Sequence, residues 1–152
     1  MDAFNILKNT FKNGGATVQL VNLNTEEYQE VKSDHWVVAL GKEHEKKLKL
    51  VKPGKNGVTQ DDLAFILKTF RNILKDVSEE VTALNRDLNE ERYSIGTWYN
   101  NFKIVVEPVE LVSLTHDAVA LGIQRDQSSI YHLTRQDYVS IDQLKELLKG
   151  VK

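Results

Sequence analysis

The sequence predicts an α+β fold: a small, mostly antiparallel sheet with helices on one side, forming a single domain over residues 1–152. Three observations predict it. Short segments such as 17–22 and 46–50 alternate apolar and polar residues, as half-buried strands do. The segment 93–107 has the pattern of a β-hairpin. One long segment, about 59–91, has the apolar spacing of a helix.

Length and composition limit the classes of protein. A chain of 152 residues can bury a core that needs no disulfide. Lys and Arg number 20 and Asp and Glu 22, and the formal charge of −2 excludes a strongly basic nucleic-acid binder and a highly acidic nucleic-acid mimic. Cys is absent, which excludes disulfides, thiolate zinc sites and a cysteine nucleophile. Because no transmembrane run or signal peptide is visible, we expect a cytoplasmic protein without a membrane partner.

The first third of the chain combines a helix with strands. Apolar residues at helical spacing predict a helix over about 2–12, and the glycine pair at 14–15 ends it. The polar segment 24–34 is expected to be a loop or lid. Strands are expected over 17–22, 35–40 and 46–50, the last of them an edge strand because its lysines discourage further pairing.

The strongest signal is a run of apolar residues at steps of four and three. Its members are Leu63, Leu67, Phe70, Leu74, Val77, Val81, Leu84 and Leu88. A continuous helix of about 32 residues would be about 48 Å long, so one end should project from the domain or be clasped. The first half is apolar nearly all round and is expected to lie buried against the sheet.

The second half of this helix keeps only a narrow apolar stripe, formed by Val77, Val81, Leu84 and Leu88. A narrow stripe suits contact with one other helix. Two partners remain open: the C-terminal helix of the same chain, or a second copy of the chain. In the second case these four residues are the self-association surface of a coiled-coil homodimer.

The hairpin is expected to turn at Asn100 and Asn101, with Tyr99 opposite Phe102. That register places one apolar set on the core face, formed by Ile95, Thr97, Tyr99, Phe102, Ile104 and Val106. Trp98 and Lys103 fall on the opposite face. Either they face a partner, or another layer such as the 141–149 helix covers Trp98. Pro108 is expected to end the pairing because it lacks the N–H donor.

The last third is expected to hold a helix from Thr115 to about Arg125, with a strand as the alternative for 116–125. A strand is expected over 128–133. Ser140 and Gln143 have the spacing of a capping box, which predicts a last helix over 141–149.

No motif points to catalysis, a metal or a cofactor. The four histidines are His35, His44, His116 and His132, and none has metal-ligand spacing. A Ser–His–Asp set can be assembled from Ser129, His132 and Asp137, but any chain of this length offers such a triple. We therefore predict no catalytic, cofactor or metal-binding residue. A small enzyme with a site near His132 or His116 is kept as the second alternative.

Binding is the class of function that the surface residues favour. The residues expected to face a protein partner are Trp98 and Lys103 of the hairpin and Glu26, Glu27 and Tyr28 of the polar segment. The first alternative is nucleic-acid binding through Lys46, Lys47, Lys49 and Lys52 of the lysine-rich segment 42–55. No aromatic residue is interleaved with these lysines for base stacking, and protection of a sheet edge explains them more simply.

Four pieces of sequence, taken together, resemble small uncharacterised proteins of phages and mobile elements of Gram-positive bacteria. They are NGGAT at 13–17, WVVALGKE at 36–43, IGTWYNNFKIVVEP at 95–108 and DAVALGIQRDQSSIYHL at 117–133. The resemblance favours a helix over 116–125 and implies an accessory protein, but it carries no reaction and no catalytic residue. The long seam from Leu63 to Leu88 and the last helix depart from that group.

The function expected from all of this is that of a non-enzymatic, phage-like accessory protein. It would bind a protein partner and form a homodimer, and inhibition of a host defence or replication protein is the natural hypothesis. Its compartment would then be the host cytoplasm.

Overall fold

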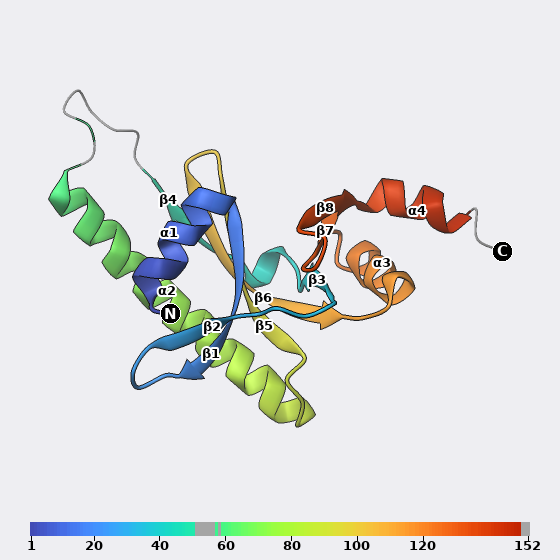
Figure 1. The fold of residues 1–152 in the computed structure, drawn as a ribbon, viewed down its shortest axis with the longest axis horizontal. Helices are drawn as coiled ribbons and strands as arrows, with labels where there is room; N and C mark the ends of the chain where they lie inside the picture. Colours follow the sequence, from blue (N-terminus) through green and yellow to red (C-terminus); the bar gives the residue numbers. More distant parts are fainter. Residues whose placement is uncertain (51–56, 58, 150–152) are drawn as a thin grey trace.

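The structure is a computed structural model that describes residues 1–50, 57 and 59–149. The described chain is an α+β fold, which confirms the predicted class (Figure 1). In chain order the elements are α1 (Ala3–Asn13), β1 (Gly15–Asn22), β2 (Glu27–Glu30), β3 (Trp36–Ala39), the 3₁₀ helix η1 (Lys42–His44), β4 (Lys46–Lys49), α2 (Gln60–Leu88), β5 (Tyr93–Asn100), β6 (Lys103–Val112), α3 (Thr115–Gln124), β7 (Ser129–His132), β8 (Asp137–Ser140) and α4 (Ile141–Lys149).

The sheet is organised around β6. The strand order is β2-β1-β5-β6-β3-β7-β8, and β4 also pairs with β6. All of these pairs are antiparallel. On one side β6 pairs with β5 over its length, and on the other its first residues pair with β4 and its last with β3. This strand therefore joins the two ends of an elongated molecule (Figure 1).

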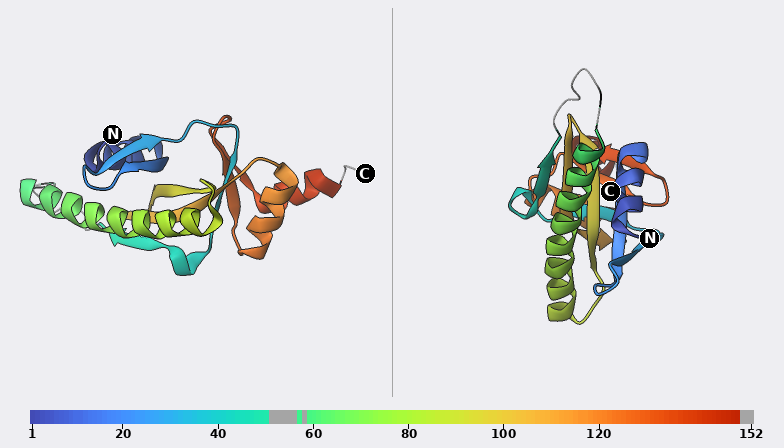
Figure 2. Two further views of the ribbon diagram at one scale, coloured as in Figure 1. Left: turned by 90° about the horizontal axis from the view of Figure 1, so that it is seen from below. Right: turned by 90° about the vertical axis from the view of Figure 1, so that its left-hand side faces the viewer.

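Two apolar cores lie at opposite ends of the molecule (Figure 2). The main core fills the space between the sheet and the helices α1 and α2. Its buried members are Ala3, Ile6, Leu7, Val18, Tyr28, Leu48, Phe70, Leu74, Val77, Val81, Ile95, Ile104 and Val106. The second core lies among β3, β7, α3 and α4 and is formed by Trp36, Val38, Val112, Ala118, Val119, Ile130, Ile141 and Leu144. The C-terminal helix thus packs on α3 and β8, away from α2.

Helix α2 is continuous, as its spacing predicted. Thr59 and Asp62 form a reciprocal capping box at its start, and Asn89 ends it in the left-handed conformation. Its 29 residues span about 44 Å. The expectation that its first half is buried is wrong. Residues 61–65 are exposed because this end of the helix extends past the strands (Figure 2), and the middle of the helix covers the sheet instead.

Three expectations about the strands need correction. The segment 24–34 contains β2, which pairs with β1. Pairing of β5 and β6 continues beyond Pro108 to Glu110. The hairpin turns at Asn101 and Phe102, which both have positive φ, and Asn100 pairs with Lys103. Each residue of β5 thus lies opposite a residue two positions further along β6 than predicted. Because side chains alternate between the two faces of a sheet, a shift of two positions leaves each strand residue on its predicted face.

Pro108 is tolerated inside β6 because no ladder bond needs its missing N–H. Tyr99 of β5 donates its backbone N–H to Gly14, on the side of β1. Because backbone groups alternate in direction along a strand, those of Ile95 also point toward β1 and away from β6. Ile95 is the residue opposite Pro108. On its other side, Pro108 lies where the partner of β6 changes from β4 to β3.

The described C-terminal helices and β7 match the prediction from the sequence, whereas the strand β8 (Asp137–Ser140) was not predicted. Residues 115–124 form α3, which decides between the helix and strand alternatives. Ser140 and Gln143 exchange backbone-to-side-chain hydrogen bonds at the start of α4 and so form the predicted capping box.

The position of α2 predicts that alanine substitutions along one seam have very different effects. Leu74 is fully buried, so Leu74→Ala is expected to lower the free energy of unfolding by about 2–5 kcal/mol. Leu63 belongs to the same seam but is 57% exposed, so Leu63→Ala is expected to change it by less than about 0.5 kcal/mol. Urea unfolding measures both. Equal losses in the two variants would contradict the described placement of α2.

Candidate functional site

The sheet face turned away from α1 and α2 carries the most unusual chemistry of the described chain. We call it the back face. Trp98 lies opposite Val105 and Gly96 opposite Glu107 in the β5–β6 pairing. The register of β4 and β6 pairs Lys47 with Val105 and brings Glu45 beside Glu107. The back face therefore places two glutamates, a lysine and a tryptophan around one short stretch of β6.

Glu107 is a buried carboxyl group with an unsatisfied oxygen. The residue is 6% exposed, and its Oε2 atom has no hydrogen-bond partner within the described part of the chain. The pKa of Glu107 is raised from 4.5 to about 7, mainly by loss of solvent and secondly by the negative charge of Glu45. A hydrogen bond from the Trp98 side chain and the charge of Lys47 act in the opposite direction. Such a displaced pKa marks a candidate functional group.

The charges around Glu107 do not balance when it is ionised. Lys47 Nζ lies 3.5 Å from Glu45 Oε2, so the one nearby ammonium group is paired with the other carboxylate. The Glu45 side chain is itself largely buried. Two carboxylates and one ammonium leave a net charge of −1 in a poorly solvated place, which favours a proton on Glu107.

A second pair of strands reaches back to cover this group. Tyr131 and Tyr138 lie opposite each other in the β7–β8 pairing, with ring centroids 4.8 Å apart. A Cβ atom at Gly15 would lie 3.5 Å from both the Tyr138 hydroxyl and Trp98 Cβ, which places Tyr138 beside Trp98. Loss of solvent around its hydroxyl group raises the pKa of Tyr138, although 59% of the residue's surface is exposed, and Tyr131 and Glu107 raise it to a lesser extent. Tyr138 of β8 thus lies near Trp98, whereas the 141–149 helix packs on α3 and β8.

Glycine is required at Gly15 because the backbone of β5 is too close for a side chain. A Cβ atom there would lie 2.7 Å from the Thr97 carbonyl oxygen. Without a side chain at this position, β1 leaves room for Tyr138 to approach Trp98.

The predicted partner-binding residues fall in three separate places. Trp98 and Lys103 both lie on the back face, two pairs apart along the hairpin. Glu26 forms an ion pair with Arg71 of α2, and Glu27 is exposed at the start of β2. Tyr28 needs correction: it is 3% exposed, and its hydroxyl lies 3.3 Å from Ser78 Oγ in the main core. It is not available to a partner in this structure.

The predicted self-association stripe is mostly used by the chain itself. Val77 and Val81 are buried in the main core, against the sheet and α1. Leu84 is half-buried, and Leu88, at the end of α2, is 44% exposed. The apolar spacing of the second half of α2 therefore reflects packing within one chain, and a second copy would find only its last turn open.

The lysines of β4 alternate between the two sheet faces. Lys46, Lys47 and Lys49 are exposed, whereas Lys52 lies outside the described residues. Lys49 pairs with Lys103, which puts both on the same face as Lys47 and Trp98. The sequence showed no aromatic residue near these lysines because Trp98 is brought to them only by strand pairing.

The histidine at the centre of the enzyme alternative has a structural role. His132 is buried and packs edge-to-face on Trp36, with centroids 4.6 Å apart. Its Nδ1 accepts the backbone N–H of Arg135, and its Nε2 lies 3.5 Å from Asp34. Both ring nitrogens are therefore engaged, and the nearest carboxylate is not the Asp137 of the assembled triad. His116 is exposed at the start of α3.

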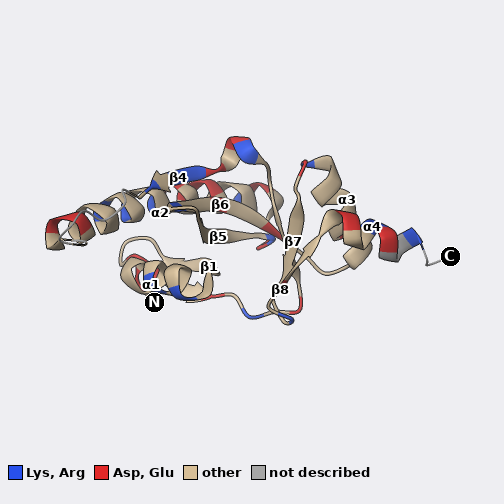
Figure 3. Ribbon diagram, turned by 90° about the horizontal axis from the view of Figure 1, so that it is seen from above, with Lys and Arg blue, Asp and Glu red and all other residues tan. Residues whose placement is uncertain are grey.

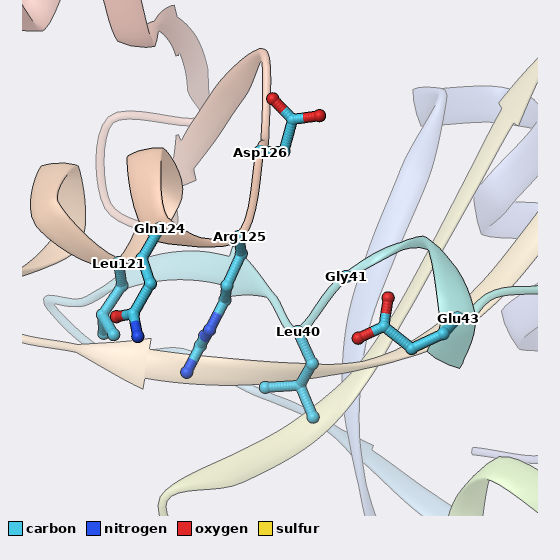
Figure 4. Close-up of a pocket in the computed structure, with 7 residues that line it drawn as sticks. All are labelled: Leu40, Gly41, Glu43, Leu121, Gln124, Arg125 and Asp126. Atoms are coloured by element: carbon cyan, nitrogen blue, oxygen red, sulfur yellow. The ribbon is translucent and has the colours of Figure 1, made fainter.

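A hollow of about 470 Å³ lies between the β3–η1 connection and the end of α3 (Figure 4). Its wall includes Arg125, which donates to Glu110 Oε1 at 2.6 Å and to the Ala39 carbonyl at 3.5 Å. This arginine thus joins the end of α3 to β6 and β3. Glu43 packs its carboxylate against Gly41, whose φ is 143°. The lining of the hollow therefore includes side chains that already have partners within the described chain.

Two further findings concern ligands and membranes. Across residues 1–50, 57 and 59–149, no three His, Asp or Glu side chains come together in a way that could hold a metal ion. Among the same residues, no helix combines the length and the apolar character needed to cross a bilayer.

The raised pKa of Glu107 predicts how stability depends on pH. The folded chain binds this proton more tightly than the unfolded chain, whose pKa is 4.5. The contribution of this proton to the free energy of unfolding is therefore complete below about pH 4.5 and is lost as the pH rises through about 7. The total change in the free energy of unfolding is about 3 kcal/mol. Glu107→Gln, which cannot ionise, should lose less stability between pH 5 and pH 8 than the wild type.

Urea unfolding at the two pH values measures this difference. Glu91→Gln provides the control, because Glu91 is exposed and should lose as much stability as the wild type over the same range. An equal loss in Glu107→Gln and in the wild type would show that Glu107 does not ionise in this interval.

No protein-family model, no curated protein and no solved structure matches this chain.

Proposed function

We propose that the protein is a non-enzymatic accessory protein that binds a protein partner through the projecting end of α2. The helix tip, residues 60–67, carries the observation on which this rests. Leu63 is 57% exposed and Phe65 is 67% exposed, although both are large apolar side chains on a well-capped helix. Exposed apolar groups gathered on one projecting element are typical of interaction sites.

The geometry of the helix tip supports a particular mode of binding. Residues two apart are separated by about 200° around a helix, so Leu63 and Phe65 point to different sides. A partner that covers both must enclose the tip, as a hydrophobic groove encloses a helix. Asp61 and Asp62 make the first turn acidic (Figure 3), which favours a groove with a basic rim.

The biological setting of the proposal comes from the resemblance to phage and mobile-element proteins. That resemblance supports a host protein as the partner, with inhibition of a defence or replication protein as the proposed outcome. Self-association through Val77 and Val81 is not part of the proposal, because the main core already occupies both.

A double substitution at the helix tip tests this function. Leu63→Ser with Phe65→Ser should leave the free energy of unfolding within about 1 kcal/mol of the wild type, because both side chains are exposed. The same change should abolish capture of a host protein from bacterial lysate, since the apolar contacts of an interface carry most of its affinity. Immobilised protein followed by mass spectrometry measures the capture.

Phe4→Ser is the matched control. Phe4 is also a large exposed apolar residue, 55% exposed, but it lies on α1. Its variant should capture the same protein as the wild type. Capture that survives the double substitution, or that Phe4→Ser abolishes equally, would place binding elsewhere.

A second candidate function rests on the lysines of the back face. Lys49 and Lys103 lie opposite each other, and Trp98 lies on the same face of the hairpin. Lysines beside an aromatic ring are the elements with which proteins hold single-stranded nucleic acid. The position of Trp98 favours this candidate. Glu45 and Glu107 weaken it, because their negative charge repels phosphate groups.

Binding of a labelled single-stranded oligonucleotide at about 50 and 200 mM salt tests the second candidate. If it holds, replacing Lys49 and Lys103 by Gln should reduce the slope of log affinity on log salt by about 0.7 per lysine. Lys46→Gln, on the other sheet face, should have no such effect. Binding absent at the lower salt concentration would exclude this function.

A further inference from the structure

We propose that Glu107 is a proton-dependent latch that holds the β7–β8 hairpin against the back face. With its proton bound, the carboxyl group stays dry beside Trp98 and Tyr138. When the proton leaves, the ionised group draws in water, and Tyr138 moves away from Trp98 and Gly15.

The contact that the latch controls joins opposite ends of the sheet. Tyr138 belongs to β8, the last strand in the sheet order, whereas Gly15 belongs to β1, near the other end. These strands do not pair with each other in the described sheet, so side-chain contact is what brings them together. A contact without a backbone ladder can open at low cost.

The groups that face Glu107 come from three neighbouring elements. Glu45 and Lys47 approach from β4 and the residue before it, Trp98 from β5, and Tyr138 from β8. Lys47 is 3.5 Å from Glu45 and leaves the charge of Glu107 without a close counterion. Burial and the charge of Glu45 favour the neutral carboxyl group, whereas the hydrogen bond from Trp98 and the charge of Lys47 favour the ionised one.

Movement of Tyr138 is the easiest way to hydrate an ionised Glu107. An ionised oxygen with no hydrogen-bond partner is costly to keep dry, and Oε2 is such an atom within the described chain. Tyr138 is 59% exposed and belongs to neither core. Displacement of the Tyr138 side chain alone therefore removes no member of either core. The pKa of about 7 for Glu107 places the change near neutral pH.

Fluorine NMR of the protein labelled with 5-fluorotryptophan tests the latch. The chain has two tryptophans, Trp36 and Trp98, and a Trp98→Phe variant assigns their signals. The Trp98 signal should titrate with a midpoint near pH 7. Amide hydrogen exchange in β7 and β8, corrected for its intrinsic pH dependence, should rise about tenfold above that midpoint.

Three variants separate the latch from other causes. In Glu107→Gln, both the titration of Trp98 and the rise in exchange should disappear. In Glu91→Gln, an exposed control, both should persist. In Tyr138→Ala, which removes the cover at an exposed position, the midpoint should fall by about one pH unit or more, because Glu107 becomes hydrated in both states.

The proposal fails if Trp98 titrates near pH 7 while exchange in β7 and β8 stays constant, since Glu107 would then ionise without releasing the hairpin. It also fails if the midpoint is unchanged in Tyr138→Ala. That variant decides the question even if Glu107→Gln does not fold.

Discussion

The structure depends on β6 being buried on both faces. Its residues alternate, as in any strand. On one face Ile104 and Val106 enter the main core and Val112 enters the second core. On the other face Val105 and Val109 are buried with Glu107 between them. Because neither face is open to water, a glutamate in this strand cannot reach solvent, and its burial is a consequence of the topology. The same strand that unites the two ends of the molecule therefore creates its most unusual ionisable group.

Local signals allowed much of this fold to be predicted. The start and end of α2 are specified by Thr59, Asp62 and Asn89, and its length by an uninterrupted apolar seam, all within the helix itself. The sequence did not predict which part of the seam packs on the sheet. That depends on where the strands end, and the strands come from distant segments of the chain. The short strand β2 was missed for a related reason: Glu27, Gln29 and Glu30 are exposed, and only Tyr28 enters the core.

The candidate site shows the same division between local and distant information. The predicted face of Trp98 was correct, because side chains alternate between the two faces of a strand. An error of two residues in the register therefore does not change the face. Glu107 was missed because a glutamate before a proline was interpreted as the end of a strand. The sequence did contain a usable signal: Glu107 and Glu110 interrupt an otherwise apolar run, and carboxyl groups in such a run are expected to be buried with it, as both are. Its neighbours Glu45 and Tyr138 could be found only from the strand order.

The two surfaces proposed to act in binding and in proton sensing are mechanically separate. Helix α2 is fixed by Phe70, Leu74 and Val77 to the face of the sheet opposite the back face. Tyr138 contributes to neither core, so its release does not disturb that packing. A partner held at the helix tip would thus be insensitive to the proton on Glu107. A ligand held by Trp98 and Lys103 would respond to it, because Trp98 donates a hydrogen bond to the carboxyl group and lies beside Gly15, where Tyr138 also approaches. The pH dependence of binding therefore distinguishes the two surfaces: a response near neutral pH belongs to the back face.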